Sequence, residues 1–371
     1  MKGLSYLALI VLATMGGHAF AMQEEGLIPL TDTELSAETG QALFNMSYIA
    51  PGGTNPNAGV GFYKLGMEAQ LDLNANIKKF QLGCGGVKGP GCDVDIDNVS
   101  FTGIVPTREK AGGTDAGPVS DFTLINPFYD IAIKNPTSAA TREVVGFRIG
   151  ADSVWGMLSM GDPGSDPGSV SSHTGVNSIT GHLPSYIENG KIPVRLCLGG
   201  ANATNTACNI GNGIDLGYAT VNRDTPNPGD NFFDLTLNRA SRAYLEGLRV
   251  QTQLLGFNVD LTSNLDESLK FIHNMTLGKD VNGNGKYDPG VDTVSKNFGI
   301  SVQGQDVRWN SNGQWLNAQK GWWMELPESK IGDFTTRTVY AGPTALTGLT
   351  LSDLNLNQSP VDNCYGNLTF C

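Results

Sequence analysis

The sequence predicts an all-β fold, mostly of antiparallel sheet, arranged as a sandwich or an extended meander with one or two short helices. The 371 residues include 48 glycines and 18 prolines, which together with Asn, Asp and Ser divide the chain into short apolar runs, as expected for strands joined by turns. Several of these runs, such as 71–78 and 93–97, alternate apolar and polar residues. This alternation gives a strand one buried and one solvated face, which is typical of antiparallel sheets.

The first 21 residues have the features of a secretory signal peptide. Lys2 provides the positive start, residues 4–15 form an apolar run, and residues 19–21 read A-x-A, a cleavage site. The mature chain is therefore expected to begin near Met22, in an oxidising compartment. We expect export to the periplasm, the outer-membrane surface or an extracellular fibre. No later window holds about 20 uninterrupted apolar residues, so we expect no transmembrane helix.

Two short helices are predicted within this β-rich chain. The capping box at 31–34 predicts a helix over about 32–39. Asn238 and Gly247 bracket a second predicted helix over 239–246. Long Gly-, Asn- and Pro-rich loops are predicted at 51–59, 105–120, 161–182 and 221–231.

The segment 41–49 follows the first predicted helix and places four residues on one face of an extended strand: Ala42, Phe44, Met46 and Tyr48. This strand either begins its own domain or adds to the sheet edge of a neighbouring subunit. The predicted organisation is a signal peptide (1–21), an N-terminal segment with the short helix and the candidate pairing strand (22–50), and one large β domain (51–371).

The six cysteines fall into three pairs that are close in sequence, and each pair brackets a Gly- or Asn-rich turn. After export, these pairs are expected to form the disulfides Cys84 with Cys92, Cys197 with Cys208, and Cys364 with Cys371. Free thiols and a zinc site are the alternatives. Zinc is disfavoured because no histidine lies near any pair.

The net charge of −12 excludes some partners. Without a Lys/Arg cluster, an acidic chain is a poor ligand for nucleic acids and anionic lipids. Cations remain suitable ligands for it.

One motif has the spacing of a calcium-binding loop: oxygen-bearing side chains at positions 1, 3, 5 and 9, a glycine at position 6 and a backbone carbonyl at position 7. Its predicted ligands to a structural Ca²⁺ are Asp280, Asn282, Asn284, Lys286 through its carbonyl, Asp288 and Asp292. The motif departs from the pattern at position 12, which is Val291, so that the last acid comes one residue late. The alternative interpretation is a polar Asn-Gly hairpin turn.

The sequence offers little for catalysis. It contains no G-x-S-x-G, H-E-x-x-H or Gly-rich phosphate loop. A Ser/His pair is conceivable near His173 and His182, but both are interpreted as exposed loop residues. The acids in 93–97 are interpreted as a solvated strand face rather than a cation site. The pair Trp322 and Trp323 either stacks on sugars or belongs to a core or interface strand, and we favour the strand.

The pattern L-x-D-x-E-L-S-x-x-T-G-Q-A over 30–42 resembles the start of a poorly characterised group of exported Gram-negative proteins, some of which are described as fimbrial or filament (Fil-type) subunits. Four further runs resemble the same group: 147–150, 154–157, 269–273 and 321–324. The resemblance implies a structural role at the cell surface or in a fibre, and it supplies no functional residues.

These observations together predict a non-enzymatic fimbria-like or surface-assembly subunit with a role in adhesion. Its expected partners are other copies of itself or other assembly subunits. The alternative is a secreted, calcium-stabilised binding or carbohydrate-active domain.

Overall fold

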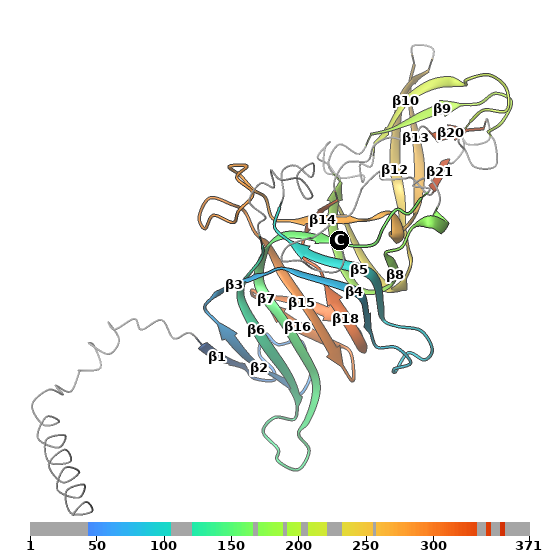
Figure 1. Cartoon of the computed structure of the whole chain (residues 1–371). Coiled ribbons are helices and arrows are strands. Elements are labelled where there is room, and N and C mark those ends of the chain that lie inside the picture. The colour runs from blue at the N-terminus through green and yellow to red at the C-terminus, as the bar shows by residue number, and fades with distance from the viewer. Residues whose placement is uncertain are drawn as a thin grey trace, which may run out of the picture. The chain divides into compact units, whose positions relative to one another are not determined.

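A computed structural model describes residues 44–104, 121–165, 170–187, 191–201, 207–220, 232–254, 257–331, 339–342 and 349–352. These residues form an almost entirely β structure, mostly antiparallel, which confirms the predicted fold class (Figure 1). The predicted signal peptide, the helix over 32–39, the loops 105–120 and 221–231, and the pair Cys364 and Cys371 lie outside the described residues.

The elements, in chain order, are β1 (Phe44–Ile49), β2 (Val60–Met67), β3 (Gln70–Leu73), β4 (Ala75–Leu82), β5 (Val94–Thr102), β6 (Phe122–Lys134), β7 (Glu143–Ser159), the 3₁₀ turn η2 (Val170–Ser172), β8 (Val176–Ile187), β9 (Lys191–Leu196), β10 (Ile214–Thr220), β11 (Phe232–Ala240), β12 (Arg242–Leu254), β13 (Phe257–Ser268), the 3₁₀ turn η3 (Leu269–Phe271), β14 (Asn274–Leu277), β15 (Ser295–Gln303), β16 (Val307–Ser311), β17 (Gln314–Ala318), β18 (Gly321–Glu325), β19 (Ser329–Ile331), β20 (Val339–Ala341) and β21 (Leu349–Ser352).

Among the described residues, the strands form one 13-stranded sheet, one six-stranded sheet and the separate hairpin β16–β17. The large sheet runs from its edge strand β1 through β2, β6 and β7 to β14, β19, β8, β18 and β15, and β15 pairs back onto β7. The six-stranded sheet has the order β20-β9-β10-β12-β13-β21. In Figure 1, β1, β2, β6 and β7 run side by side, as their pairing requires.

The antiparallel register of these four strands separates two kinds of side chain. One cross-strand row joins Lys64, Asp130 and Arg148, and the adjacent row joins Leu65 to Tyr129 and continues onto β1 and β7. Because successive side chains point to opposite sides of a strand, these two rows lie on opposite faces of the sheet. We call the face that carries Lys64 the covered face and the other the open face.

The hairpin β16–β17 packs on the covered face. Trp309 is 2% exposed and meets the ring of Phe62 edge-on, with ring centroids 5.5 Å apart. Gly146 lies beneath it, and a Cβ at this position would come within 2.9 Å of the Trp309 ring. Any larger residue at 146 would therefore displace the tryptophan.

A buried ion pair joins the hairpin to the sheet. Arg148 and Asp130, both about 3% exposed, form a salt bridge, with Arg148 Nε donating to Asp130 at 3.1 Å. Arg148 also donates to Ser311 Oγ and to the Asn310 carbonyl oxygen, each at 2.6 Å. Burial raises the pKa of Asp130 and lowers that of Arg148. Such a pair tolerates burial only while its hydrogen bonds stay satisfied.

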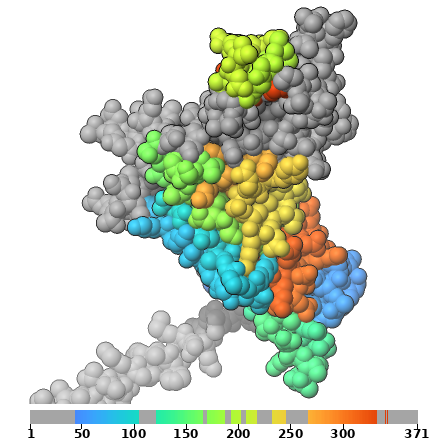
Figure 2. All heavy atoms as spheres, turned by 90° about the vertical axis from the view of Figure 1, so that its right-hand side faces the viewer, coloured from blue at the N-terminus to red at the C-terminus, as the bar shows by residue number. Residues whose placement is uncertain are grey.

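Two of the three predicted disulfides lie in the described residues and are confirmed: Cys84–Cys92 and Cys197–Cys208. The described cysteines include no free thiol. The first disulfide loop lies against β11, where Arg239 donates to the carbonyl of Pro90 at 2.8 Å. In Figure 2, cyan atoms of the part of the chain that contains this loop lie beside yellow atoms of the part that contains β11.

The helix predicted over 239–246 is wrong. Residues 239 and 240 end β11, and β12 begins at 242 and pairs with β13 over its length. The capping and stop signals are local, whereas pairing with β8 and β13 satisfies the backbone on both strands, so tertiary context overrides helix propensity. The loop predicted over 161–182 is also partly wrong, because β8 begins at 176.

Candidate functional site

Strand β1 forms an edge of the large sheet. It pairs only with β2, from Phe44 opposite Met67 to Ile49 opposite Phe62, and no other described strand pairs with it. It is thus the first strand of its own domain, as one of the two interpretations of the sequence expected. Its sequence, FNMSYI, contains no charge and no proline, the usual features that protect an edge from further pairing. Among the described residues, its outer backbone groups therefore remain available to another strand.

The open face begins at this edge and is entirely uncharged over four strands. Its positions, assigned from register and alternation, are Phe44, Met46 and Tyr48 on β1; Gly61, Tyr63, Leu65 and Met67 on β2; Pro127, Tyr129, Ile131 and Ile133 on β6; and Val144, Phe147 and Ile149 on β7. Met46 is the most exposed, at 79%, and Leu65 at its centre is 43% exposed. The charged side chains of these strands, such as Lys64 and Arg148, lie on the covered face.

A cavity of about 460 Å³ opens at the β7 side of the open face. Its lining includes Leu71, Phe80, Tyr129, Ile149 and Trp322. The volume is in the range of small-ligand pockets. Only three lining side chains carry a polar group, Gln70, Tyr129 and Trp322, and the rest of the lining is apolar, so the cavity is suited to an apolar group.

Sequence reasoning found the β1 part of this surface, Phe44, Met46 and Tyr48, but missed its continuation over β2, β6 and β7. Its signal was present in the alternation of Tyr129 with Asp130 and of Arg148 with Ile149. The alternation alone does not show which of the two faces of the sheet is covered in the fold.

The predicted calcium motif forms the connection between β14 and β15, closed by a bridge between Lys279 and Thr293. Asp280 accepts the N–H groups of Gly283 and Gly285, both at 2.7 Å. Gly285 has φ +76°, the sharp turn that the sixth position of such loops requires.

The remaining oxygens of this loop also turn inward. Asp288 accepts the side-chain amides of Asn282 and Asn284, both at 2.6 Å. Asp292 accepts the N–H groups of Asp288 at 2.8 Å and Val281 at 2.9 Å. The structure thus brings the predicted side chains into one loop, where they bind each other and the loop backbone.

Lys286, predicted to act through its carbonyl, donates its N–H to Asn284 at 2.8 Å. Across the described ranges, no three His, Cys, Asp or Glu side chains are grouped so as to hold a metal ion. Calcium binding therefore stays a prediction, and the hydrogen-bonded loop is also what the polar-turn interpretation expects.

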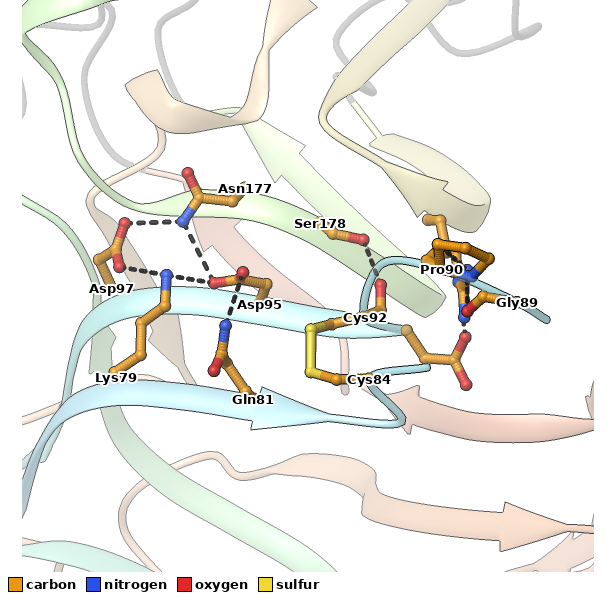
Figure 3. Close-up of a disulfide and its surroundings, with 12 residues drawn as sticks. Lys79, Gln81, Cys84, Gly89, Pro90, Cys92, Asp95, Asp97, Asn177 and Ser178 are labelled. Carbon is orange, nitrogen blue, oxygen red and sulfur yellow. Dashed lines mark hydrogen bonds and ion pairs between the residues drawn. A yellow bond between two sulfur atoms is a disulfide. The ribbon is translucent and has the colours of Figure 1, made fainter. Parts of the chain in front are cut away.

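The acids of the 93–97 strand are paired with protein groups (Figure 3). Lys79 bridges Asp95 at 2.5 Å and Asp97 at 2.7 Å, and Asn177 donates to both. Burial alone would raise the pKa of Asp95 and Asp97, but these hydrogen bonds outweigh it and lower both pKa values. The interpretation as a simple solvated face is therefore incomplete, because a lysine forms ion pairs with these carboxylates and an amide donates hydrogen bonds to them.

Asp93, the first acid of this run, is buried at 1% exposure. It accepts from Arg239 Nε at 2.9 Å and from the N–H of Trp322 at 2.9 Å. It thus ties the first disulfide loop to β11 and β18.

The interpretation of His173 as an exposed loop residue is wrong. His173 is 3% exposed and its Nδ1 lies 2.9 Å from Nε2 of His273, whose ring stacks on it with centroids 5.0 Å apart. His273 Nδ1 donates to the carbonyl of Met160 at 2.8 Å. In a neutral pair, His273 Nε2 is then the acceptor and His173 the donor. The two rings fill the core below η2.

The same interpretation is also wrong for His182, which lies within β8 and is partly buried. Its Nδ1 lies 2.6 Å from Glu325 Oε1, and its Nε2 contacts Asp234. Burial alone would lower the pKa of His182, but the hydrogen bond and charge of Glu325, with the charge of Asp234, raise the pKa above 6.5. Because carboxylates engage both nitrogens, this histidine holds three strands together and has no nitrogen left to activate a nucleophile.

No protein family model, curated protein or solved structure matches this chain. Within the described ranges, the chain forms no helix of the length and hydrophobicity that a bilayer crossing requires.

Removal of calcium is expected to destabilise the wild-type protein. EDTA should lower the melting temperature by several degrees, because a ligand that binds only the folded state stabilises it by mass action. Asp280→Ala should abolish this shift, whereas Val281→Ala, in the same loop, should keep it. Thermal melts with EDTA and with added Ca²⁺ measure the effect, and a wild-type melt indifferent to EDTA would rule out the site.

The raised pKa of His182 predicts a pH-dependent contribution to stability. The contribution is fully present below the unfolded pKa of about 6.5 and is lost as the pH rises through the folded pKa. His182→Gln should therefore lower the free energy of unfolding by about 1–3 kcal/mol near pH 5.5 and by less near pH 9. Urea unfolding at both pH values measures this, and a loss that does not change with pH would contradict the assignment.

Proposed function

We propose that this chain is an exported, non-enzymatic structural subunit of a bacterial surface assembly, fimbria-like or adhesive. The observation that carries the proposal is the unprotected edge of β1, continuous with the uncharged open face. Soluble monomers rarely expose a contiguous apolar patch beyond a few hundred Å², and larger patches mark interaction sites.

The edge offers a specific mode of assembly. A strand from a neighbouring subunit can add to the outer side of β1 through main-chain hydrogen bonds. Side chains of the added strand on one side would then extend the apolar row of Phe44, Met46 and Tyr48. This mode needs no catalytic group.

Export is supported by the two disulfides of the described residues, since such bonds persist in oxidising compartments. We place the mature protein in the periplasm, at the outer-membrane surface or in an extracellular fibre. Its proposed partners are further copies or other assembly subunits.

The second candidate function is a calcium-stabilised binding or carbohydrate-active domain. The inward-turned oxygens of the loop between β14 and β15 favour it. It ranks second because the cavity beside the open face is lined by apolar groups, although Trp322 is among them. Sugars need several polar partners to replace their hydration.

The proposal predicts that a charge on the β1 edge blocks assembly. Met46→Lys changes a side chain that is 79% exposed, so the fold of the single subunit should persist. It should reduce surface assembly at least about tenfold, because an unpaired ammonium buried in an apolar contact costs more than 1.4 kcal/mol. Unboiled cell-surface fractions on gels, with electron microscopy of the cell surface, measure the ladders or filaments.

The matched control is Ile210→Lys, which adds the same charge at a position that is 75% exposed and away from the open face. It should assemble as the wild type does. Wild-type cells without ladders or filaments, or a Met46→Lys variant that assembles normally, would refute the proposed function.

A further inference from the structure

We infer that the open face docks a second copy of this chain, so that two sheets stack face to face about a two-fold axis. The inference deepens the proposed function, on which it rests, by naming the partner of the same site.

The chemistry of the open face favours a copy over a charged partner. The chain has 36 acids and a net charge of −12, yet all 14 positions of this face are uncharged. A partner with charged side chains would have to bury them without ion-pair partners, which is costly. An identical face meets this one with apolar and tyrosine side chains only, the composition typical of interface cores. Isologous contacts of this kind are the commonest in homodimers.

The size of the open face fits a stable dimer. Nine of its large side chains are at least 36% exposed: Phe44, Met46, Tyr48, Tyr63, Leu65, Tyr129, Val144, Phe147 and Ile149. With roughly 180 Å² per side chain and half of it exposed, they present on the order of 800 Å². Two such faces bury about 1,600 Å² in total, the standard size of a specific protein interface.

The strand order also gives the stack a defined geometry. The strands of the open face lie in the order β1, β2, β6, β7. We place the two-fold axis parallel to these strands and between β2 and β6. This axis sets β1 of each copy over β7 of the other. Packed sheets lie about 10 Å apart with interdigitating side chains. Met46 of one copy then lies over Ile149 of the other, at the mouth of the 460 Å³ cavity, which it enters.

A membrane surface is a poorer occupant of this face. Lipid-binding surfaces of peripheral proteins combine apolar groups with basic ones, and the open face has no Lys or Arg among its positions. The negative net charge of the chain also opposes anionic lipids.

The first test is the mass of the purified mature protein, with its disulfides intact, by sedimentation equilibrium over a concentration series. We expect twice the mass of one chain. Leu65→Glu, at the centre of the face, should weaken the dimer at least about a hundredfold, since each copy then buries an unpaired carboxylate against Tyr129 of the other. Ile210→Glu adds the same charge off the face and should leave the dimer unchanged. Circular dichroism checks that both variants fold.

The second test is the crossed contact itself. Protein carrying Met46→Cys, mixed with protein carrying Ile149→Cys, should form a disulfide between chains under mild oxidation. Met46→Cys mixed with Ile210→Cys should not, because no contact between β1 and that loop is expected in the dimer.

A wild-type monomer, a dimer indifferent to Leu65→Glu, or equal cross-linking in both mixtures would overturn the inference. A monomer that floats with neutral phosphatidylcholine vesicles would assign the face to a membrane instead. If the protein is a monomer while Met46→Lys still blocks surface assembly, the inference fails and the proposed function stands. If the dimer forms as described but wild-type cells show no assembly, the proposed function fails and the inference stands.

Discussion

The buried ion pair between Arg148 and Asp130 joins directly opposite residues of β6 and β7 and favours their observed register, on which the division of the sheet into two faces depends. A slip of one residue would turn every side chain of a strand to the other face. It would place Tyr129 or Ile149 beneath the β16–β17 hairpin and the charges outside. The hydrogen bonds from Arg148 to β16 hold the hairpin over the same face.

The part of the sheet that the hairpin leaves uncovered is the surface on which the proposed assembly rests. The open face reaches the edge strand β1 and the apolar cavity beside β7 without a charged residue. Edge and face offer two separate contacts, one through the backbone and one through side chains. A subunit with both can form a pair through its face and extend it through its edge, which is the behaviour that a surface assembly needs.

Period-two alternation and turn-forming residues predicted the all-β fold, and close spacing predicted the two disulfides now described, because these signals act within a few residues. The spacing of the motif also predicted that six residues of the 280–292 segment come together in one loop. These local signals gave wrong predictions where contacts between residues far apart in the sequence determine the structure. β11 and β12 replaced the helix over 239–246 because they pair with β8 and β13. His182 was taken for a loop residue because its partners, Glu325 and Asp234, are far away in sequence.

The ion pair can be tested most directly by urea unfolding of Asp130→Leu, Arg148→Met and the double variant. Each single change should cost about 3–5 kcal/mol, because it leaves one buried charge without its partner, and the double change should recover most of that loss. Single variants as stable as the wild type, or a double variant whose loss equals the sum of the two, would contradict the claim that this pair favours the observed register of the sheet.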